Sequence, residues 1–270
     1  MQYQYKGFSE RLRCGFGKAL ALALGMLVLV FAFSQSAMSA SALPEMIQRV
    51  KPSIVAVGTF ERTRSPAFNM RGTGFVLGAG NMIATCAHVL PESLSGSGGE
   101  ALVVRIPSQS GELQQRAAKL LSVDRAHDLA VLEIEGQRLP AISLSSEMVK
   151  EGQETAFIGF PIGTVLGLTP VTHRAIISAI TPIALPGATA QQLTEKMIRR
   201  LKSGTYDVYQ LDGTAYPGNS GGPLLNTETG EVIGIINMVF VKGTKEATLS
   251  HPSGISFAIP VVYLQELLQQ

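Results

Sequence analysis

Residues 73–90 read TGFVLGAGNMIATCAHVL, and they set the class of fold. Two short apolar and β-branched runs, Thr73 to Gly78 and Met82 to Ala84, are separated by Ala, Gly and Asn. Runs of this kind between turn residues are typical of neighbouring β-strands. The second run continues to His88, just before the Pro91 loop, so a strand would hold an imidazole at its end.

Runs of the same character fill the chain after Leu43. We count twelve such runs. Six of them precede residue 140, at 53–58, 73–78, 82–84, 101–106, 117–123 and 129–134. The other six lie at 155–159, 172–181, 208–211, 223–225, 232–241 and 254–259. The pattern predicts an all-β protein, a barrel or sandwich, whose two halves join in a polar stretch around Pro140. Helical periodicity is confined to 44–50, 191–202 and a short C-terminal segment after Pro260.

The composition favours a chain with a large apolar core and no need for a charged partner. Of the 270 residues, 46% are hydrophobic, 22 are Lys or Arg, and 20 are Asp or Glu. Residues 1–42 carry four basic groups and one acidic group, a net charge of +3, which leaves −1 for residues 43–270. This balance gives no reason to expect nucleic acid or an anionic membrane as a partner.

The N-terminal segment is predicted to be an export signal. A basic stretch precedes an unbroken apolar and small run from Ala19 to Phe33, and Ala40-Ser41-Ala42 offers a cleavage site. The run is shorter than the roughly 20 residues that span a bilayer as a helix. We expect residues 1–42 to be a signal peptide, with retention as a membrane anchor as the alternative, and a periplasmic or secreted location. Cleavage would leave Cys86 as the single cysteine, which excludes an internal disulfide.

A glycine-rich stretch around a serine is the strongest candidate for chemistry. Residues 217–223 read PGNSGGP, and glycine-rich backbone reaches conformations that are closed to other residues. Such backbone can direct N–H groups at one point, as the oxyanion formed by a serine nucleophile requires. Ser220 is the candidate nucleophile. The candidate oxyanion hole is the segment of Gly218, Asn219 and Ser220, with the N–H groups of Gly218 and Ser220 as donors. Taken alone, the stretch fits an ordinary turn equally well.

A serine hydroxyl needs a base that accepts its proton, and a histidine is the usual base. The chain has four histidines. His88 has the best position, because it ends a strand-like run at a loop. His173 lies within a strand pattern, and His251 lies in a polar loop.

The base in turn needs a carboxylate that fixes its tautomer. Asp128 directly precedes the apolar run 129–134, which would tie its backbone to a strand. In the structural alternative, Asp128 caps a turn and His127 is a neighbouring surface group. The order His88, Asp128, Ser220 puts the base and its orienter in the first half of the chain and the nucleophile in the second, so the site is expected between the halves. Three further aspartates remain possible, at Asp124, Asp207 and Asp212.

Three segments resemble the catalytic motifs of trypsin-like serine proteases, namely TCAHV at 85–89, HDLAVL at 127–132 and GNSGGPL at 218–224. Other segments are similar to those of the HtrA/Deg branch of that family, at 72–76, 156–163 and 254–260. The resemblance extends from about residue 50 to residue 260, and three motifs in the family's order are a specific signal. It implies two six-stranded antiparallel β-barrels packed against each other, followed by a short C-terminal helix.

The resemblance also implies a serine endopeptidase domain over 43–270, with barrels at about 50–138 and 152–260 and with His88, Asp128 and Ser220 as its triad. Polypeptide substrates, such as envelope or misfolded proteins, and a homo-oligomer such as a trimer are expected, without a metal or organic cofactor. The primary pocket would draw on Thr214, Asn237 and Val239. Because no acidic side chain falls there, small or medium apolar residues are favoured before the scissile bond.

Departures from the family change these expectations. The sequence continues for ten residues after Pro260, where the branch usually has a PDZ domain, so regulation by a PDZ domain in cis is not expected. Asn219 stands where digestive relatives have an aspartate that pairs with a freshly cut N-terminus, so activity is not expected to need such a cut. The connection from Thr181 to Tyr206 is longer than in the family, which leaves the gating of activity open.

Two other hypotheses compete with a triad protease. A protease-like module could bind extended peptides without cutting them, because a sequence does not show how the oxyanion N–H groups point. The stretch from Gly218 to Gly222 also fits the G-x-S-x-G pattern of α/β-hydrolase esterases. However, no aspartate follows Ser220, and Gly-Gly-Pro is a poor start for the helix that those enzymes require.

Overall fold

The computed structural model describes residues 42–91, 99–107, 113–163, 167–182, 206–237 and 254–270. The predicted signal segment before residue 42, the helix expected at 191–202, His251 and Val239 lie outside the described residues. The chain divides into two units, Met1–Glu45 and Met46–Gln270. The twelve strands found in the described residues all belong to the second unit, which is considered by itself below.

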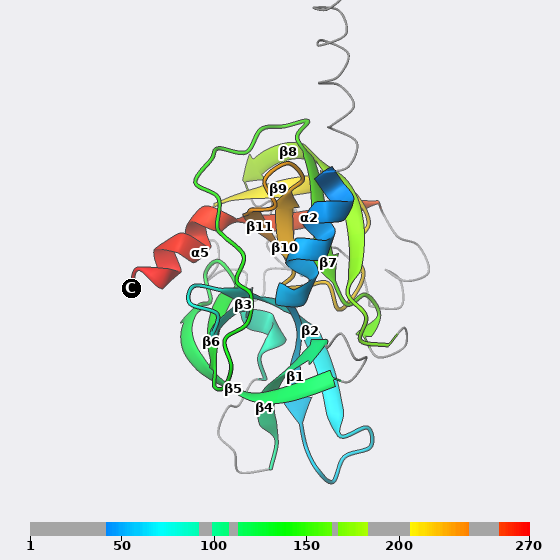
Figure 1. The fold of residues 1–270 in the computed structure, drawn as a ribbon. Helices are drawn as coiled ribbons and strands as arrows, with labels where there is room; N and C mark the ends of the chain where they lie inside the picture. The colour runs from blue at the N-terminus through cyan, green and yellow to red at the C-terminus, as the bar shows by residue number, and fades with distance from the viewer. Residues whose placement is uncertain (1–41, 92–98, 108–112, 164–166, 183–205, 238–253) are drawn as a thin grey trace, which may run out of the picture. The chain divides into compact units, whose positions relative to one another are not determined.

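Twelve antiparallel strands form two closed six-stranded barrels, as expected (Figure 1). The first has the order β1-β2-β3-β6-β5-β4, with strands β1 (Ile54–Phe60), β2 (Phe68–Leu77), β3 (Met82–Cys86), β4 (Ala101–Pro107), β5 (Leu113–Asp124) and β6 (Leu129–Ile134). The second has the order β10-β11-β12-β9-β8-β7, with strands β7 (Glu154–Gly159), β8 (Val171–Pro182), β9 (Asp207–Asp212), β10 (Pro223–Asn226), β11 (Val232–Asn237) and β12 (Ile255–Pro260). Such a double barrel has no parallel sheet, which rules out the α/β-hydrolase hypothesis.

Each barrel surrounds its own apolar core. In the first barrel Phe75, Ile83 and Leu132 are fully buried, and in the second Phe157 and Ile236 are. Burying one such side chain contributes about 1.5–3 kcal/mol. Because closure leaves no free sheet edge, the apolar runs of the sequence become continuous inner walls.

Two strands are longer than the apolar pattern indicates. β2 begins at Phe68, whereas the expected run begins at Thr73. The strand starts earlier because the segment 68–72 also pairs with β1. β5 begins at Leu113, and its first five residues are exposed or half-buried, with Ala118 the first buried one. In both cases main-chain hydrogen bonds extend the strand past the buried side chains.

Helices flank the barrels. The expected C-terminal helix is α5 (Val261–Leu268), which buries Val261, Leu264 and Leu267 and packs on β5, β11 and β12 (Figure 1). The helix expected near residues 44–50 is α2 (Ala42–Val50). In the part of the chain that the structure describes, no helix combines the length and the apolar character needed to cross a bilayer.

Candidate active site

His88 and Asp128 form a close pair on the first barrel. His88 lies in the 3-10 turn η3 (Ala87–Val89), directly after β3. Its Nδ1 is 2.6 Å from Asp128 Oδ2, and its backbone N–H donates to Asp128 Oδ1 over 2.9 Å. One carboxylate thus holds both the backbone and the ring of His88. A proton on Nδ1 facing the carboxylate leaves Nε2 free to accept another proton.

Asp128 is itself held on several sides. Its backbone has φ of 59°, a left-handed conformation that few non-glycine residues adopt, and its carbonyl accepts the Ala87 N–H over 2.9 Å. Asn237, at the end of β11 in the second barrel, donates from Nδ2 to Asp128 Oδ2 over 2.8 Å. Asn237 was expected in the substrate pocket, and this contact with Asp128 was missed. The bond ties the carboxylate of one barrel to the other barrel.

The backbone of the serine loop is almost completely engaged. The carbonyls of Pro217 and Asn219 accept hydrogen bonds from the N–H groups of Ile162 and Gly222. The carbonyls of Gly218 and Ser220 accept bonds from the side chain and the N–H of Thr73.

The remaining N–H groups of this loop divide into two sets. Those of Asn219, Gly221 and Gly222 donate to backbone carbonyls. Among the described residues, the N–H groups of Gly218 and Ser220 have no backbone acceptor. These two are the donors expected for the oxyanion. Asn219, the residue between them in the predicted oxyanion hole, donates its own N–H to the Tyr216 carbonyl over 2.9 Å.

Thr73 joins the serine loop to both barrels. Its Oγ1 donates to the Gly218 carbonyl over 2.6 Å and accepts the Phe160 N–H over 3.1 Å, while its own N–H donates to the Ser220 carbonyl over 2.8 Å. A threonine hydroxyl can donate and accept at once, so one buried side chain fixes the direction of the Gly218 peptide.

Glycines let the serine loop approach the His88 turn. A Cβ at Gly72 would lie 2.6 Å from Cγ2 of Val89 and 2.8 Å from the Ser220 carbonyl oxygen. A Cβ at Gly221, where φ is 85°, would lie 2.2 Å from the Thr73 carbonyl oxygen and 3.0 Å from the Cys86 nitrogen. Both positions therefore require glycine, and the Ser220 carbonyl and the side chain of Val89, the residue after His88, both lie beside Gly72.

Cys86 is the last residue of β3 and directly precedes the turn that carries His88. Its thiol is fully buried and donates to the Ile236 carbonyl over 3.4 Å. Burial, and secondarily the Asp128 carboxylate, raise the pKa of the Cys86 thiol well above its usual value of 9.0. The donor atoms of Cys86, His88 and Asp128 lie within 4.8 Å of one another. A protonated thiol and a carboxylate already bound to an imidazole are a poor donor set for a metal, so none is assigned.

The other candidates have different surroundings. Asp124 pairs with His127, and Asp207 and Asp212 are exposed ends of β9. The His173 ring stacks on Phe157 at 4.7 Å between centroids. The expected pocket residue Thr214 lies between β9 and the serine loop, half-buried.

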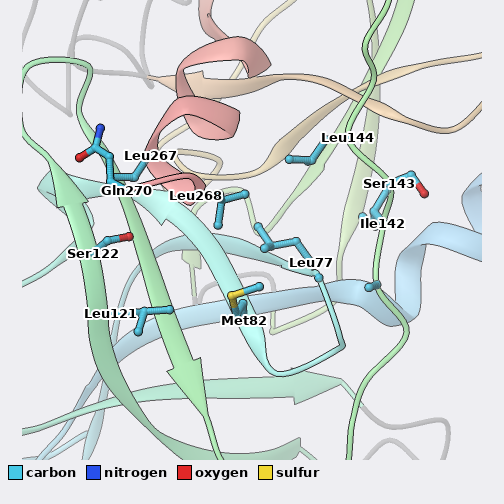
Figure 2. Close-up of a pocket in the computed structure, with 12 residues that line it drawn as sticks. Leu77, Met82, Leu121, Ser122, Ile142, Ser143, Leu144, Leu267, Leu268 and Gln270 are labelled. Carbon is cyan, nitrogen blue, oxygen red and sulfur yellow. The ribbon is translucent and has the colours of Figure 1, made fainter.

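A separate pocket lies where α5 meets the first barrel. It is lined by Leu77 and Met82 of the β2–β3 hairpin, by Leu144 of the connection between the barrels, and by Leu267 and Leu268 of α5 (Figure 2). None of its lining residues belongs to the candidate active site.

Two barrels with a His–Asp pair on the first and a Gly-Asn-Ser-Gly-Gly loop on the second define the class of trypsin-like serine peptidases. The sequence comparisons agree, because residues 72–235 match the trypsin-like peptidase domain family. The chain therefore belongs to this family.

Individual relatives place the chain near the HtrA/Deg branch. It is 32% identical over 203 residues to a probable periplasmic serine endoprotease DegP-like of Pseudomonas putida (strain GB-1), covering 74% of this chain and 36% of the relative. It is 30% identical over 225 residues to serine protease HTRA3 of Rattus norvegicus, covering 81% of this chain and 42% of the relative. The chain thus spans well under half of the length of these relatives.

Solved structures show the same fold. Deg5 superposes with a TM-score of 0.59 at 24% identity, over 84% of this chain and 92% of Deg5. The HtrA-type protease AlgW, solved with a tripeptide, superposes with a TM-score of 0.57 at 26% identity, over 83% of this chain and 61% of that chain.

Proposed function

We propose that this chain is an exported serine endopeptidase that cleaves polypeptides through an acyl-enzyme. The observation that carries the proposal is the bonding of the serine loop, in which only the N–H groups of Gly218 and Ser220 lack a backbone acceptor among the described residues, beside the His88 turn. Two fixed donors at one point are what a tetrahedral oxyanion needs.

In the proposed reaction the Ser220 hydroxyl attacks the substrate carbonyl carbon while His88 accepts its proton. The carbonyl oxygen becomes an oxyanion, which accepts hydrogen bonds from the Gly218 and Ser220 N–H groups. His88 then gives the proton to the leaving amine, and the peptide bond breaks. Water, deprotonated by His88, then attacks the acyl carbon, the bond to Ser220 Oγ breaks, and His88 returns the proton to Oγ as the acid leaves. Asp128 holds the His88 ring in the required tautomer throughout.

The comparisons support a periplasmic endoprotease, because relatives carry that description in their names. We propose a periplasmic or secreted location after removal of residues 1–42, and polypeptide substrates such as damaged envelope proteins. We further propose that Thr214 and Val239 contribute to a pocket for small or medium apolar side chains, and that the chain assembles as a homo-oligomer such as a trimer. A profile of cleavage sites made with the chain lacking residues 1–42 would report the preference of the pocket directly.

Replacement of the nucleophile tests the proposal. We expect Ser220→Ala to abolish casein cleavage, because no other hydroxyl occupies the loop, with an unchanged circular dichroism spectrum. The control is Ser146→Ala, an exposed serine in the connection between the barrels, which should cleave at the wild-type rate. Undiminished cleavage by the Ser220 variant would refute the assignment.

The competing hypothesis is a module that binds peptides without cutting them. The bonding of the serine loop argues against it. The Gly218 and Ser220 N–H groups share peptide units with the Pro217 and Asn219 carbonyls, and these carbonyls accept hydrogen bonds from the Ile162 and Gly222 N–H groups. The two oxyanion N–H groups therefore point away from those bonds. A module of that kind would bind casein equally well with Ser220 or with alanine there, and neither form would cleave it.

A further inference from the structure

A second histidine–aspartate pair lies next to the first in the sequence. His127 Nδ1 is 2.5 Å from Asp124 Oδ2, and the His127 N–H donates to Asp124 Oδ1 over 3.1 Å. The Ala126 N–H donates to the same oxygen over 2.8 Å. The Asp124 carboxylate thus holds both the backbone and the ring of His127, in the manner in which Asp128 holds His88.

Two tyrosines from the second half of the chain enclose the His127 ring. Tyr263 of α5 stacks on it with ring centroids 4.1 Å apart and an angle of 11° between the planes. Tyr206, just before β9, meets its edge at 4.6 Å and 69°, and the two tyrosines pack at 5.4 Å. Ring pairs in such geometries contribute about 0.5–1.5 kcal/mol beyond the burial of their surface. We call His127, Asp124, Tyr206 and Tyr263 the tyrosine clamp.

The clamp is joined directly to the proposed catalytic carboxylate. His127 is covalently bonded to Asp128, whose backbone is left-handed, so a rotation at His127 would move the Asp128 carboxylate. We propose that His127 is a positioning residue, which fixes the turn at Asp128 so that its carboxylate meets His88. The proposal rests on the proposed function and adds a role for a residue that the sequence pattern places only in the structural alternative, as a surface group.

The charges around His127 agree with a fixed pair. Burial alone would raise the pKa of the Asp124 carboxyl, but hydrogen bonds from the His127 ring and from backbone N–H groups outweigh it, so the pKa lies below its usual value of 3.8. Asp124 is therefore ionised at neutral pH. Among the described residues, the other titratable groups in ring contact with His127 are Tyr206 and Tyr263, and burial raises the pKa of the Tyr263 hydroxyl. The His127 ring thus faces an Asp124 carboxylate that stays ionised around neutral pH.

The surroundings of His127 differ from those of His88, because its ring packs on two tyrosines whereas the His88 turn lies beside the serine loop. The His127 Nδ1 is bonded to Asp124, one face of this ring packs on Tyr263, and Tyr206 meets its edge. It contacts none of the proposed reacting atoms. Its influence must pass through the backbone to Asp128.

Two variants separate the parts of the contact. His127→Ala removes both the ring stack and the donor, whereas His127→Asn keeps a donor near the place of Nδ1 and removes the stack. The first readout is the strongly deshielded proton resonance of His88 Nδ1, which reports the hydrogen bond to Asp128. It is measured in a Ser220→Ala background, so it does not depend on proteolysis. The second readout is kcat and KM for peptide hydrolysis in the otherwise wild-type chain. His173→Asn is the matched control, because this ring is stacked too but contacts neither pair.

We expect His127→Ala to shift or broaden the His88 resonance and to lower kcat about ten-fold with unchanged KM, and His127→Asn to recover part of both losses. The resonance should be unchanged in His173→Asn.

If His127→Ala lowers only the melting temperature, with the resonance and kcat unchanged, the tyrosine clamp only stabilises the fold and the proposal is wrong. Should His127→Ala not fold, Tyr263→Leu and His127→Asn carry the same test, and an unshifted resonance in both would overturn it. If no variant has proteolytic activity but the resonance shifts as expected, the proposed function fails while the positioning role stands.

Discussion

The two histidine–aspartate pairs of this molecule have the same local bonding and different surroundings. In each, one carboxylate accepts the backbone N–H and the Nδ1 of a histidine. The carboxylate of the first pair also accepts the Asn237 amide, and its histidine turn lies beside the serine loop. The histidine of the second is enclosed by two tyrosines. A histidine–aspartate pair alone therefore does not define a catalytic base. The groups that surround the histidine ring define it: the serine loop near His88 and the two tyrosines around His127.

The two pairs also differ in how exposed the histidine ring and its carboxylate are. The His88 side chain is 32% exposed over an Asp128 side chain that is 12% exposed. In the second pair the values are 23% for His127 and 21% for Asp124. The first pair thus combines an accessible ring with a more deeply buried carboxylate, and a lower local dielectric strengthens the interaction of that carboxylate with a charged ring.

Exchange of each carboxylate for an amide should give the largest difference between the pairs. We expect Asp128→Asn to lower kcat about 10⁴-fold, because the amide no longer fixes the tautomer or stabilises the charged ring. Asp124→Asn should lower kcat by less than about ten-fold, because Asp124 acts only through the turn. Steady-state peptide hydrolysis measures both. Equal losses in the two variants would remove the distinction between the pairs.

Removal of the third partner of Asp128 should have the next largest effect. Asn237→Ala takes away a hydrogen bond to a charged group, which is worth about 1.5–3 kcal/mol. If the bond acts on the transition state, kcat falls roughly ten- to hundred-fold. The control is Asn226→Ala, a buried asparagine of the same barrel that caps a turn through Glu228 and Thr229. That variant should lose stability but keep its kcat, and a kcat loss as large as that of Asn237→Ala would speak against a specific role of Asn237.

The acid stability of the protein should report the second pair. Because the pKa of Asp124 is lowered on folding, the stability that it contributes is present above its unfolded value of 3.8 and is lost as the pH falls through the lower folded value. We expect wild type to exceed Asp124→Asn by about 1 kcal/mol at neutral pH, a modest figure because solvent screens the partly exposed pair. Urea unfolding at several pH values measures this difference. It should shrink below about pH 4, and a constant difference would contradict an ionised, hydrogen-bonded Asp124.

The smallest effect concerns Cys86 beneath the first pair. Because its thiol is buried and its pKa is raised, we expect almost no reaction with iodoacetamide in the folded protein, and rapid reaction in urea. Mass spectrometry of the peptide that contains Cys86 follows the modification. Fast labelling of the folded protein together with loss of activity would contradict this expectation, because it would show that the Cys86 thiol is accessible to solvent.

The sequence predicts the barrels well because they depend on short apolar runs, and closure turns each run into an inner wall. It underestimates β2 and β5, whose outer residues are held by main-chain pairing that leaves no hydrophobic signal. The order of the three motifs indicates that His88 and Asp128 meet, and the structure confirms this contact.

Other contacts of the site have no local signal. Asn237 reaches Asp128 across 109 residues, and Thr73 reaches Gly218 across 145. A single polar residue in a strand does not reveal a partner so far along the chain. The ring contacts of His127 have no local signal for the same reason, because Tyr206 and Tyr263 become its neighbours only when the second barrel and α5 are in place.

Labelling of Ser220 by a fluorophosphonate, located by mass spectrometry, is the most direct test of the claim that the first pair activates this serine. The account predicts a single adduct at Ser220 in wild type, none in Ser220→Ala, near-complete loss of labelling in His88→Ala and only about ten-fold slower labelling in His127→Ala. Adducts that form equally fast in the two histidine variants, or a folded chain that cleaves casein without an adduct at Ser220, would contradict it.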